Sequence, residues 1–128
     1  MVAAALVFAG FAVLFHVAAF VLESLLWTRP AVYGRFAVGT QQEADILRPM
    51  AYNQGFYNLS LALGVIVGAV LLTRTGDAFA AGKALMIFGT ASMSVAGLVL
   101  ASSGRSYLKS ASLQFFPAVI ALLLTIAA

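Results

Sequence analysis

Four long apolar segments, separated by short polar breaks, make up most of this chain. Their approximate bounds are residues 2–28, 49–73, 80–102 and 107–127. Each segment approaches or exceeds the ~20 residues that an α-helix needs to cross the ~30 Å hydrocarbon layer of a bilayer. The pattern therefore predicts an all-α membrane protein, folded as an antiparallel four-helix transmembrane bundle that forms one domain over residues 1–128.

The three connections between these segments differ in length. Residues 74–79 and 103–106 form short links, which make sequential helices antiparallel neighbours. The first connection, residues 29–48, is much longer, and structureless loops of that length are uncommon in compact proteins. It either folds over one mouth of the bundle or forms a flexible, solvated linker. Pro49 marks the expected start of the second helix, because proline is favoured in the first helical turn.

Composition adds support for a membrane environment. The chain has 128 residues, of which 63% are hydrophobic and 9% are charged, whereas soluble domains carry about 25% charged residues. Its net charge of +3 comes from basic residues that lie mostly between the apolar segments, which is typical of a membrane protein rather than of a nucleic-acid binder. The absence of cysteine excludes disulfides and thiolate chemistry. The first apolar run is too long for a cleaved signal peptide, so we expect an uncleaved first helix.

The distribution of basic residues predicts the orientation in the membrane. The side of the 29–48 connection carries Arg29, Arg35, Arg48, Arg105 and Lys109, against Arg74 and Lys83 on the opposite side. Because basic residues are more frequent in cytoplasmic loops, we expect the 29–48 connection to be cytoplasmic and both termini to lie outside. The expected location is a bacterial cytoplasmic (inner) membrane.

Two titratable side chains interrupt the first apolar segment. His16 and Glu23 lie seven residues apart, which is nearly two helical turns, so both project from one face. An acidic group inside a membrane helix costs about 2.5–3.5 kcal/mol on insertion scales and usually marks a functional interior. We therefore expect a buried Glu23, and we take Glu23 and His16 as candidate catalytic, proton-transferring residues. At about 10.5 Å apart along the helix, the two do not pair directly.

The start of the second apolar segment carries a run of polar residues, Asn53-Gln54-Gly55-Phe56-Tyr57-Asn58. On a helix its polar members form one broad arc, and Gly55 falls behind that arc, where another helix backbone can approach closely. Glu23 and Asn53 each lie about 12 Å from the midpoint of their helix, on the same side. Antiparallel neighbours would therefore bring Glu23 level with Asn53 and Gln54.

These depths predict a polar pocket that opens toward the cytoplasm. The candidate ligand-binding residues are Asn53, Gln54, Tyr57, Asn58, Gln114 and Trp27. Structural alternatives stand beside this hypothesis. Amides inside membrane bundles often only join helices, at roughly 0.6 kcal/mol per hydrogen bond, and His16 can equally be a packing residue. Trp27 also has the position of a membrane-interface anchor.

Several small residues indicate how the helices pack. Gly64 and Gly68 form a GxxxG pair in the second segment, and Gly89 and Gly97 belong to a small-residue stripe in the third. Such positions allow close helix contact, within one chain or between copies. In the fourth segment, Pro117 breaks the backbone hydrogen-bond ladder next to Gln114 and predicts a kink.

The residues around these positions resemble a known family. His16, Glu23, Trp27 and Phe36, together with the Asn-Gln-Gly-x-Tyr-Asn run at residues 53–58 and the following Leu61-Ala62, are similar to the small four-helix membrane proteins catalogued as domain of unknown function 1304. The resemblance covers essentially the whole chain, and the 53–58 run is its most specific part. It implies a single-domain four-helix membrane protein and implies no activity.

Three functions fit the sequence. The first is binding of a small lipid-soluble molecule, with proton-transfer chemistry of an isomerase-like kind on an isoprenoid or sterol-like compound. The second is a non-catalytic accessory subunit that docks on a larger membrane complex, and the third is a small transporter, acting as a homo-oligomer. The lipid bilayer is the expected partner and nucleic acid is not. No metal site is predicted, no cofactor is identified, and nothing besides His16 favours haem.

Overall fold

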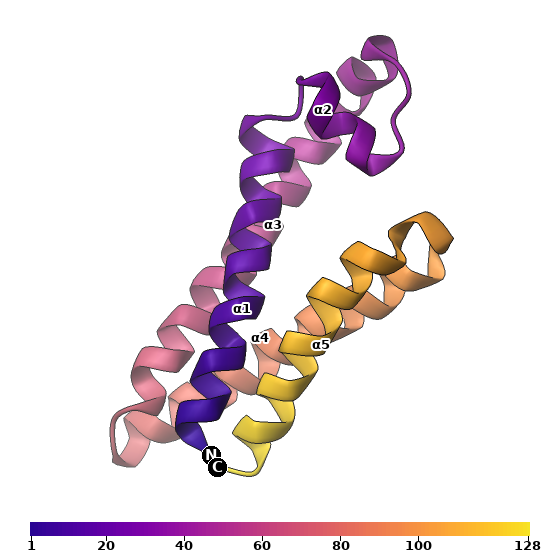
Figure 1. Ribbon diagram of the computed structural model, residues 1–128. Helices are drawn as coiled ribbons and strands as arrows, with labels where there is room; N and C mark the ends of the chain where they lie inside the picture. The colour runs from indigo at the N-terminus through magenta and orange to yellow at the C-terminus, as the bar shows by residue number, and fades with distance from the viewer. The chain divides into compact units, whose positions relative to one another are not determined.

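The fold is entirely helical, as the hydrophobic pattern predicts. The computed structural model describes all 128 residues, Met1–Ala128, and contains no strand (Figure 1). The first helix, α1, covers Val2–Phe20 and continues into a π-helical turn at Val21–Leu25. The remaining elements are α2 at Pro30–Tyr33, a 3-10 turn at Gly34–Phe36, α3 at Gln41–Leu72, α4 at Gly76–Ser102, a 3-10 turn at Arg105–Tyr107 and α5 at Leu108–Ile126.

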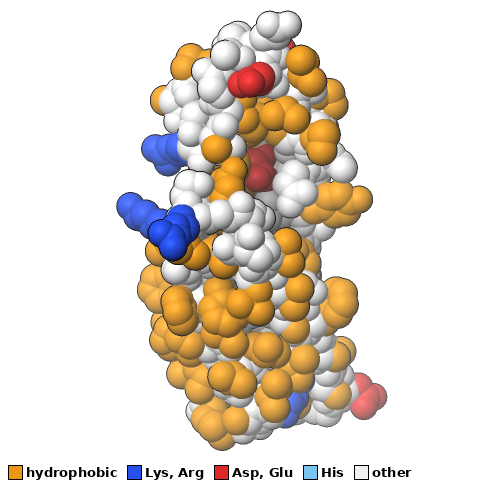
Figure 2. All heavy atoms as spheres, turned by 90° about the vertical axis from the view of Figure 1, so that its right-hand side faces the viewer, with side chains coloured by type: hydrophobic (Ala, Val, Ile, Leu, Met, Phe, Trp, Pro, Cys, Tyr) orange, Lys and Arg blue, Asp and Glu red, His pale blue; other side chains and the backbone are white.

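Four of the helical segments are long and apolar enough to cross a membrane. They are Val2–Leu25, Gln41–Leu72, Gly76–Ser102 and Arg105–Ile126. In their most apolar stretches only 22–33% of the residues are buried inside the protein. Hydrophobic side chains accordingly cover most of the face seen in Figure 2. So large an apolar surface is unsuited to water and fits the lipid interior of a bilayer. The orientation of the four spans, including their antiparallel order, stays a prediction.

The second long helix starts earlier than the hydrophobic pattern indicates. α3 begins at Gln41, and Pro49 lies inside it rather than at its start. A capping box explains the difference: Glu43 N–H donates to Thr40 Oγ1 over 3.2 Å, and Glu43 Oε2 accepts from the N–H groups of Gly39 and Thr40 over 3.1 Å each. Because the residues in these first turns are polar, the pattern of apolar residues does not indicate that they are helical. The cap satisfies backbone donors that a helix start leaves unpaired.

The chain divides into two compact units. The first unit comprises Met1–Phe15 and Leu61–Ala128, and the second unit comprises His16–Ser60. The core of the first unit consists of Ala9, Ala12, Val65, Leu72, Met86, Met93, Ala118 and Ala121. Half of these are alanine, so helix backbones in this unit approach one another closely.

Glycines set the closest helix contacts of the first unit. A Cβ atom added to Gly82 would lie 2.7 Å from the backbone carbon of Leu71, and one added to Gly97 would lie 3.1 Å from Phe115 Cα. The backbones of α3 and α4, and of α4 and α5, therefore touch at these points (Figure 1). Gly68 meets Met86 in the same way, whereas Gly64, its partner in the GxxxG pair, has nothing within 4 Å.

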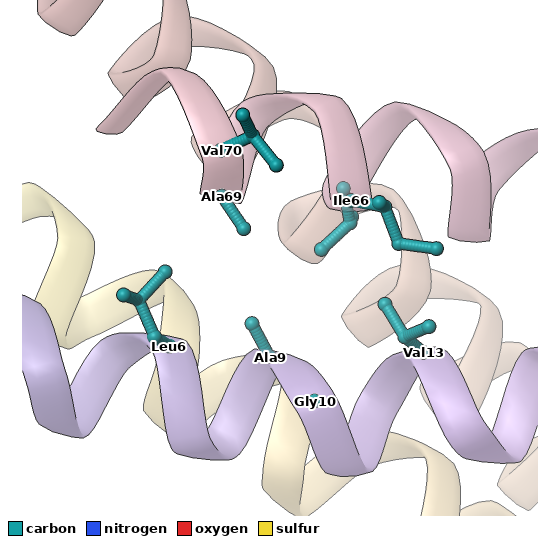
Figure 3. A pocket seen from close by; sticks show the side chains of 8 residues that line it. Leu6, Ala9, Gly10, Val13, Ile66, Ala69 and Val70 are labelled. Atoms are coloured by element: carbon teal, nitrogen blue, oxygen red, sulfur yellow. The ribbon is translucent and has the colours of Figure 1, made fainter. Parts of the chain in front are cut away.

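An open groove of about 200 Å³ lies between α1 and α3 within the first unit. Its lining residues are Leu6, Ala9, Gly10, Val13, Val65, Ile66, Ala69 and Val70. Figure 3 shows Leu6, Ala9 and Val13 of α1 facing α3 across the gap. No polar or titratable side chain reaches the groove, so it offers apolar contact and no chemistry.

The second unit has a different kind of core, built on aromatic residues. Trp27, Tyr33, Val38, Ala44 and Ala51 are buried together, with Phe36 and Leu47 packed against them. The Trp27 Nε1–H donates to Ala44 O over 2.8 Å, and the Trp27 and Phe36 rings lie 5.3 Å apart. The start of the 29–48 connection therefore folds onto the end of the first span and the first turns of α3, and is not a solvated linker.

Candidate functional site

Glu23 lies in the middle of the π-helical turn at Val21–Leu25. Leu26 N–H donates to Val21 O over 3.0 Å, a bond between residues five apart instead of the usual four. Such a turn adds one residue to the helix and is often found at functional sites. Glu23 is part-buried rather than fully buried. Its side chain therefore stands inside an otherwise apolar span without being sealed from its surroundings.

A hydrogen bond across the two helices fixes the Glu23 carboxylate. Asn58 Nδ2 donates to Glu23 Oε2 over 2.8 Å, and Asn58 is buried, with 9% of its surface exposed. No buried side-chain nitrogen or oxygen atom lacks a hydrogen-bond partner. The other carboxylate oxygen, Oε1, takes no part in this bond and is not a buried atom that lacks a partner.

The partner of Glu23 is one helical turn from the residues predicted to be level with it. Phe20 faces Phe56, with ring centroids 5.2 Å apart, and Ser24 Oγ donates to Tyr52 O over 2.9 Å. These contacts put the Glu23 backbone level with Asn53, as the midpoint argument expects. Side chains lean toward the N-terminus of their own helix. In two helices of opposite direction, Glu23 and Asn58 lean toward each other and meet.

Glycine decides which face of α3 meets the first span. A Cβ atom on Gly55 would collide with Ser24 Oγ and would lie 3.1 Å from Ser24 N. Closest approach therefore occurs at Gly55, and Asn58, three residues on, lies beside that contact. The polar pattern places Gly55 behind the polar arc but does not identify Ser24 as its neighbour. The glycine amid bulky polar residues was the signal that marks the contact face.

The predicted polar arc is consequently split. Asn53, Gln54 and Tyr57 are exposed, and the hydrogen bond to Glu23 comes from Asn58. Their role in binding a ligand beside Glu23 stays a prediction. Of the amide run, the structure brings only Asn58 to the carboxylate.

The three other candidate residues are all buried. His16 is fully buried in the second unit, and Gln114 is 6% exposed in the first unit, so that its grouping with Glu23 stays a prediction. Trp27 is 6% exposed and its indole N–H is bonded to Ala44 O. It therefore holds the aromatic core together and does not face outward as a membrane-interface anchor would. No three His, Asp or Glu side chains gather to hold a metal ion.

Four apolar spans and a carboxylate–amide pair between two of them define a helical integral membrane protein with a polar site. A family model described as "Protein of unknown function (DUF1304)" matches residues 10–126, and the chain belongs to this family. No match was found among curated proteins or among solved structures. The family assigns no activity, so any function has to be argued from the site.

Proposed function

We propose that the Glu23–Asn58 pair binds the polar end of a small lipid-soluble molecule. The observation that carries this proposal is a part-buried carboxylate that Asn58 holds through Oε2, while Oε1 takes no part in that bond. A carboxylate accepts hydrogen bonds, so the ligand must offer an O–H or N–H group. Bonds to a charged group are worth about 1.5–3 kcal/mol, which is enough to select such a ligand from bulk lipid.

The position of the pair along α3 supports a ligand that enters from the membrane. α3 has 32 residues and is about 48 Å long, well beyond the ~30 Å hydrocarbon layer. Its first turns carry Glu43, Asp45 and Arg48, which belong outside that layer. Counting about 20 residues back from Leu72 places the boundary near Asn53. Asn58 then lies roughly one turn inside, at the depth of an amphiphile's polar end.

Proton transfer is the chemistry this arrangement would support. Glu23 would take a proton from one carbon of the bound molecule, and a protonated His16, nearly two turns deeper on the same helix, would give a proton to another carbon; proton exchange with water would then return both side chains to their starting states. Such an isomerisation moves a hydrogen and a double bond, conserves atoms and electrons, and needs no cofactor. The support for this chemistry is a pair of titratable residues seven positions apart on one span.

Mass spectrometry of co-purified lipid tests the binding proposal. The full chain is extracted from its own membranes in mild detergent, and bound molecules are compared among the wild type, Glu23→Gln and Asn58→Leu. We expect one enriched amphiphile with a hydroxyl or amine group, lost at least tenfold in both variants. Asp77→Asn is the matched control, because it removes an exposed carboxylate in the first turn of α4. Equal recovery from Glu23→Gln and wild type would reject the proposal.

A further inference from the structure

The carboxylate of Glu23 has no lysine or arginine near it on either of the two spans that hold it. The chain carries none of these residues from Met1 to Thr28 or from Pro49 to Thr73. The side chain that bonds the carboxylate is the neutral amide of Asn58, which donates over 2.8 Å. An ionised carboxylate carries a full negative charge shared by two oxygens, whereas an amide offers only N–H donors. The bond to Asn58 therefore leaves the charge of an ionised Glu23 without an opposite charge.

The basic side chains of the second unit lie away from this pair. Arg48, the nearest basic residue on α3, is ten residues from Asn58, which is about 15 Å along the helix axis. Arg29, the first basic residue after Glu23, lies beyond the π-helical turn, directly before α2. The imidazole-bearing His16 is about 10.5 Å from Glu23 along the first span. The environment of Glu23 is set by its apolar surroundings and by the Asn58 amide, and no arginine contributes to it.

Three aromatic rings meet at the level of the pair. The ring centroid of Phe20, three residues before Glu23, lies 5.2 Å from that of Phe56, and the ring centroid of Tyr52 lies 4.9 Å from that of Phe56. Residues three apart on a helix are neighbours on its surface, so Phe20 lies beside Glu23. Phe56 and Tyr52 are 41% and 52% exposed. Because the faces of aromatic rings attract cations, these rings favour a positively charged group over a neutral hydroxyl.

We infer that the polar end of the bound molecule is a protonated amine, so that the ligand is a cationic amphiphile. This inference rests on the binding proposed above and chooses between the two donors, O–H and N–H, that the proposal allows. An ammonium group has three N–H donors and no acceptor, which suits a carboxylate that accepts from Asn58 through Oε2 alone. Moving an ammonium group out of water costs free energy, and pairing it with an opposite charge offsets that cost. An alcohol brings one donor and no charge.

Equilibrium dialysis with matched probes tests this inference. The full chain is reconstituted in phosphatidylcholine nanodiscs and dialysed against radiolabelled dodecylamine or 1-dodecanol, which differ only in their polar group. Empty nanodiscs measure the partition of each probe into lipid, which is subtracted. We expect dodecylamine to bind about tenfold more tightly than 1-dodecanol, because it adds a full charge to the hydrogen bond.

Two variants locate the origin of this preference. Glu23→Gln retains an oxygen that can accept from Asn58 Nδ2 and removes the charge, so the affinities for the two probes should then agree within about twofold. Asp77→Asn is the matched control, because it removes an exposed carboxylate in the first turn of α4. It should keep the preference of the wild type. A preference for dodecylamine that persists in Glu23→Gln would overturn the inference.

Failure of this inference can be told apart from failure of the binding proposal. If 1-dodecanol binds as tightly as dodecylamine and both are lost in Glu23→Gln, the amine is wrong and the binding proposal stands. If neither probe binds above empty nanodiscs, the inference is overturned, and the lipid recovered from native membranes decides the binding proposal separately. That lipid is also an independent measurement: an amine nitrogen in its formula supports the inference, whereas a nitrogen-free alcohol contradicts it.

Discussion

The two compact units of this chain are held together by different means. In the first unit, contacts at Gly82, Gly97 and Gly68 bring helix backbones together, and the hydroxyls of Thr90 and Thr125 bond to carbonyls of their own helices. In the second unit, side chains cross between elements. Trp27 bonds to Ala44 O, Ser24 to Tyr52 O and Asn58 to Glu23.

The difference follows from where the hydrophobic effect operates. Inside lipid, burying one apolar side chain against another gains little, so association relies on close packing by small residues. At the membrane boundary and beyond it, aromatic burial and hydrogen bonds again favour a folded arrangement. The second unit places polar side chains between helical segments in a fixed geometry, and the candidate site lies there.

The largest effect we expect is from Trp27→Ala, which removes the centre of the aromatic core. Truncating a buried tryptophan costs about 3–5 kcal/mol, and Ala44 O also loses its donor. The free energy of unfolding in mixed detergent micelles measures the loss. Amide hydrogen exchange should accelerate over residues 29–51. Trp27→Phe keeps one aromatic ring but loses the indole N–H and the second ring, so it should cost less than Trp27→Ala, with about 1 kcal/mol of that loss from the hydrogen bond. Equal losses for both variants would contradict a role in packing.

A smaller effect is expected in the first unit from Gly82→Ala. Alanine improves helix propensity by up to about 1 kcal/mol, but its Cβ atom would lie 2.7 Å from the Leu71 backbone, and overpacking costs roughly 1–3 kcal/mol. Gly64→Ala is the matched control, because nothing lies within 4 Å of that position. We expect Gly82→Ala to unfold about 2 kcal/mol more easily than Gly64→Ala, by the same micelle titration. Indistinguishable variants would show that backbone contact does not hold this unit together.

The smallest effect concerns the start of α3. Thr40→Ala removes the acceptor for Glu43 N–H and should cost about 1 kcal/mol, the usual value of an N-cap. Hydrogen exchange should increase over residues 41–48, which lie outside the predicted hydrocarbon layer. Thr40→Ser retains the hydroxyl and should behave as wild type. If Thr40→Ser exchanges as fast as Thr40→Ala, the cap does not set the beginning of this helix.

The sequence predicted the spans better than it predicted the site. Apolar length alone located all four helices, since crossing a bilayer demands a long run of similar residues. It failed at the start of α3, because Gln41 to Arg48 is polar, although the Thr-x-x-Glu spacing at residues 40–43 is a capping signal. The unusual position of Glu23 was visible directly, because a carboxylate is rare in such a run.

The orientation of α3 about its own axis was not available from polarity. An arc centred on Asn53 and a contact face centred on Gly55 are both consistent with the pattern, and close approach of backbones decides between them. The π-helical turn has no recognisable composition at all. It arises from packing in three dimensions, and it determines which way the Glu23 side chain points.

That turn has a consequence for how relatives are compared. Because Val21–Leu25 holds one residue more than regular helix would, the alignment of Glu23 with Asn58 depends on the number of residues preceding it as well as on their kind. A one-residue deletion there would restore an ordinary helix and swing the carboxylate by about 100°. In a relative that lacks one residue within this stretch, the carboxylate would therefore no longer point toward the residue that corresponds to Asn58. This would hold even where a glutamate is still present at the adjacent position of the alignment.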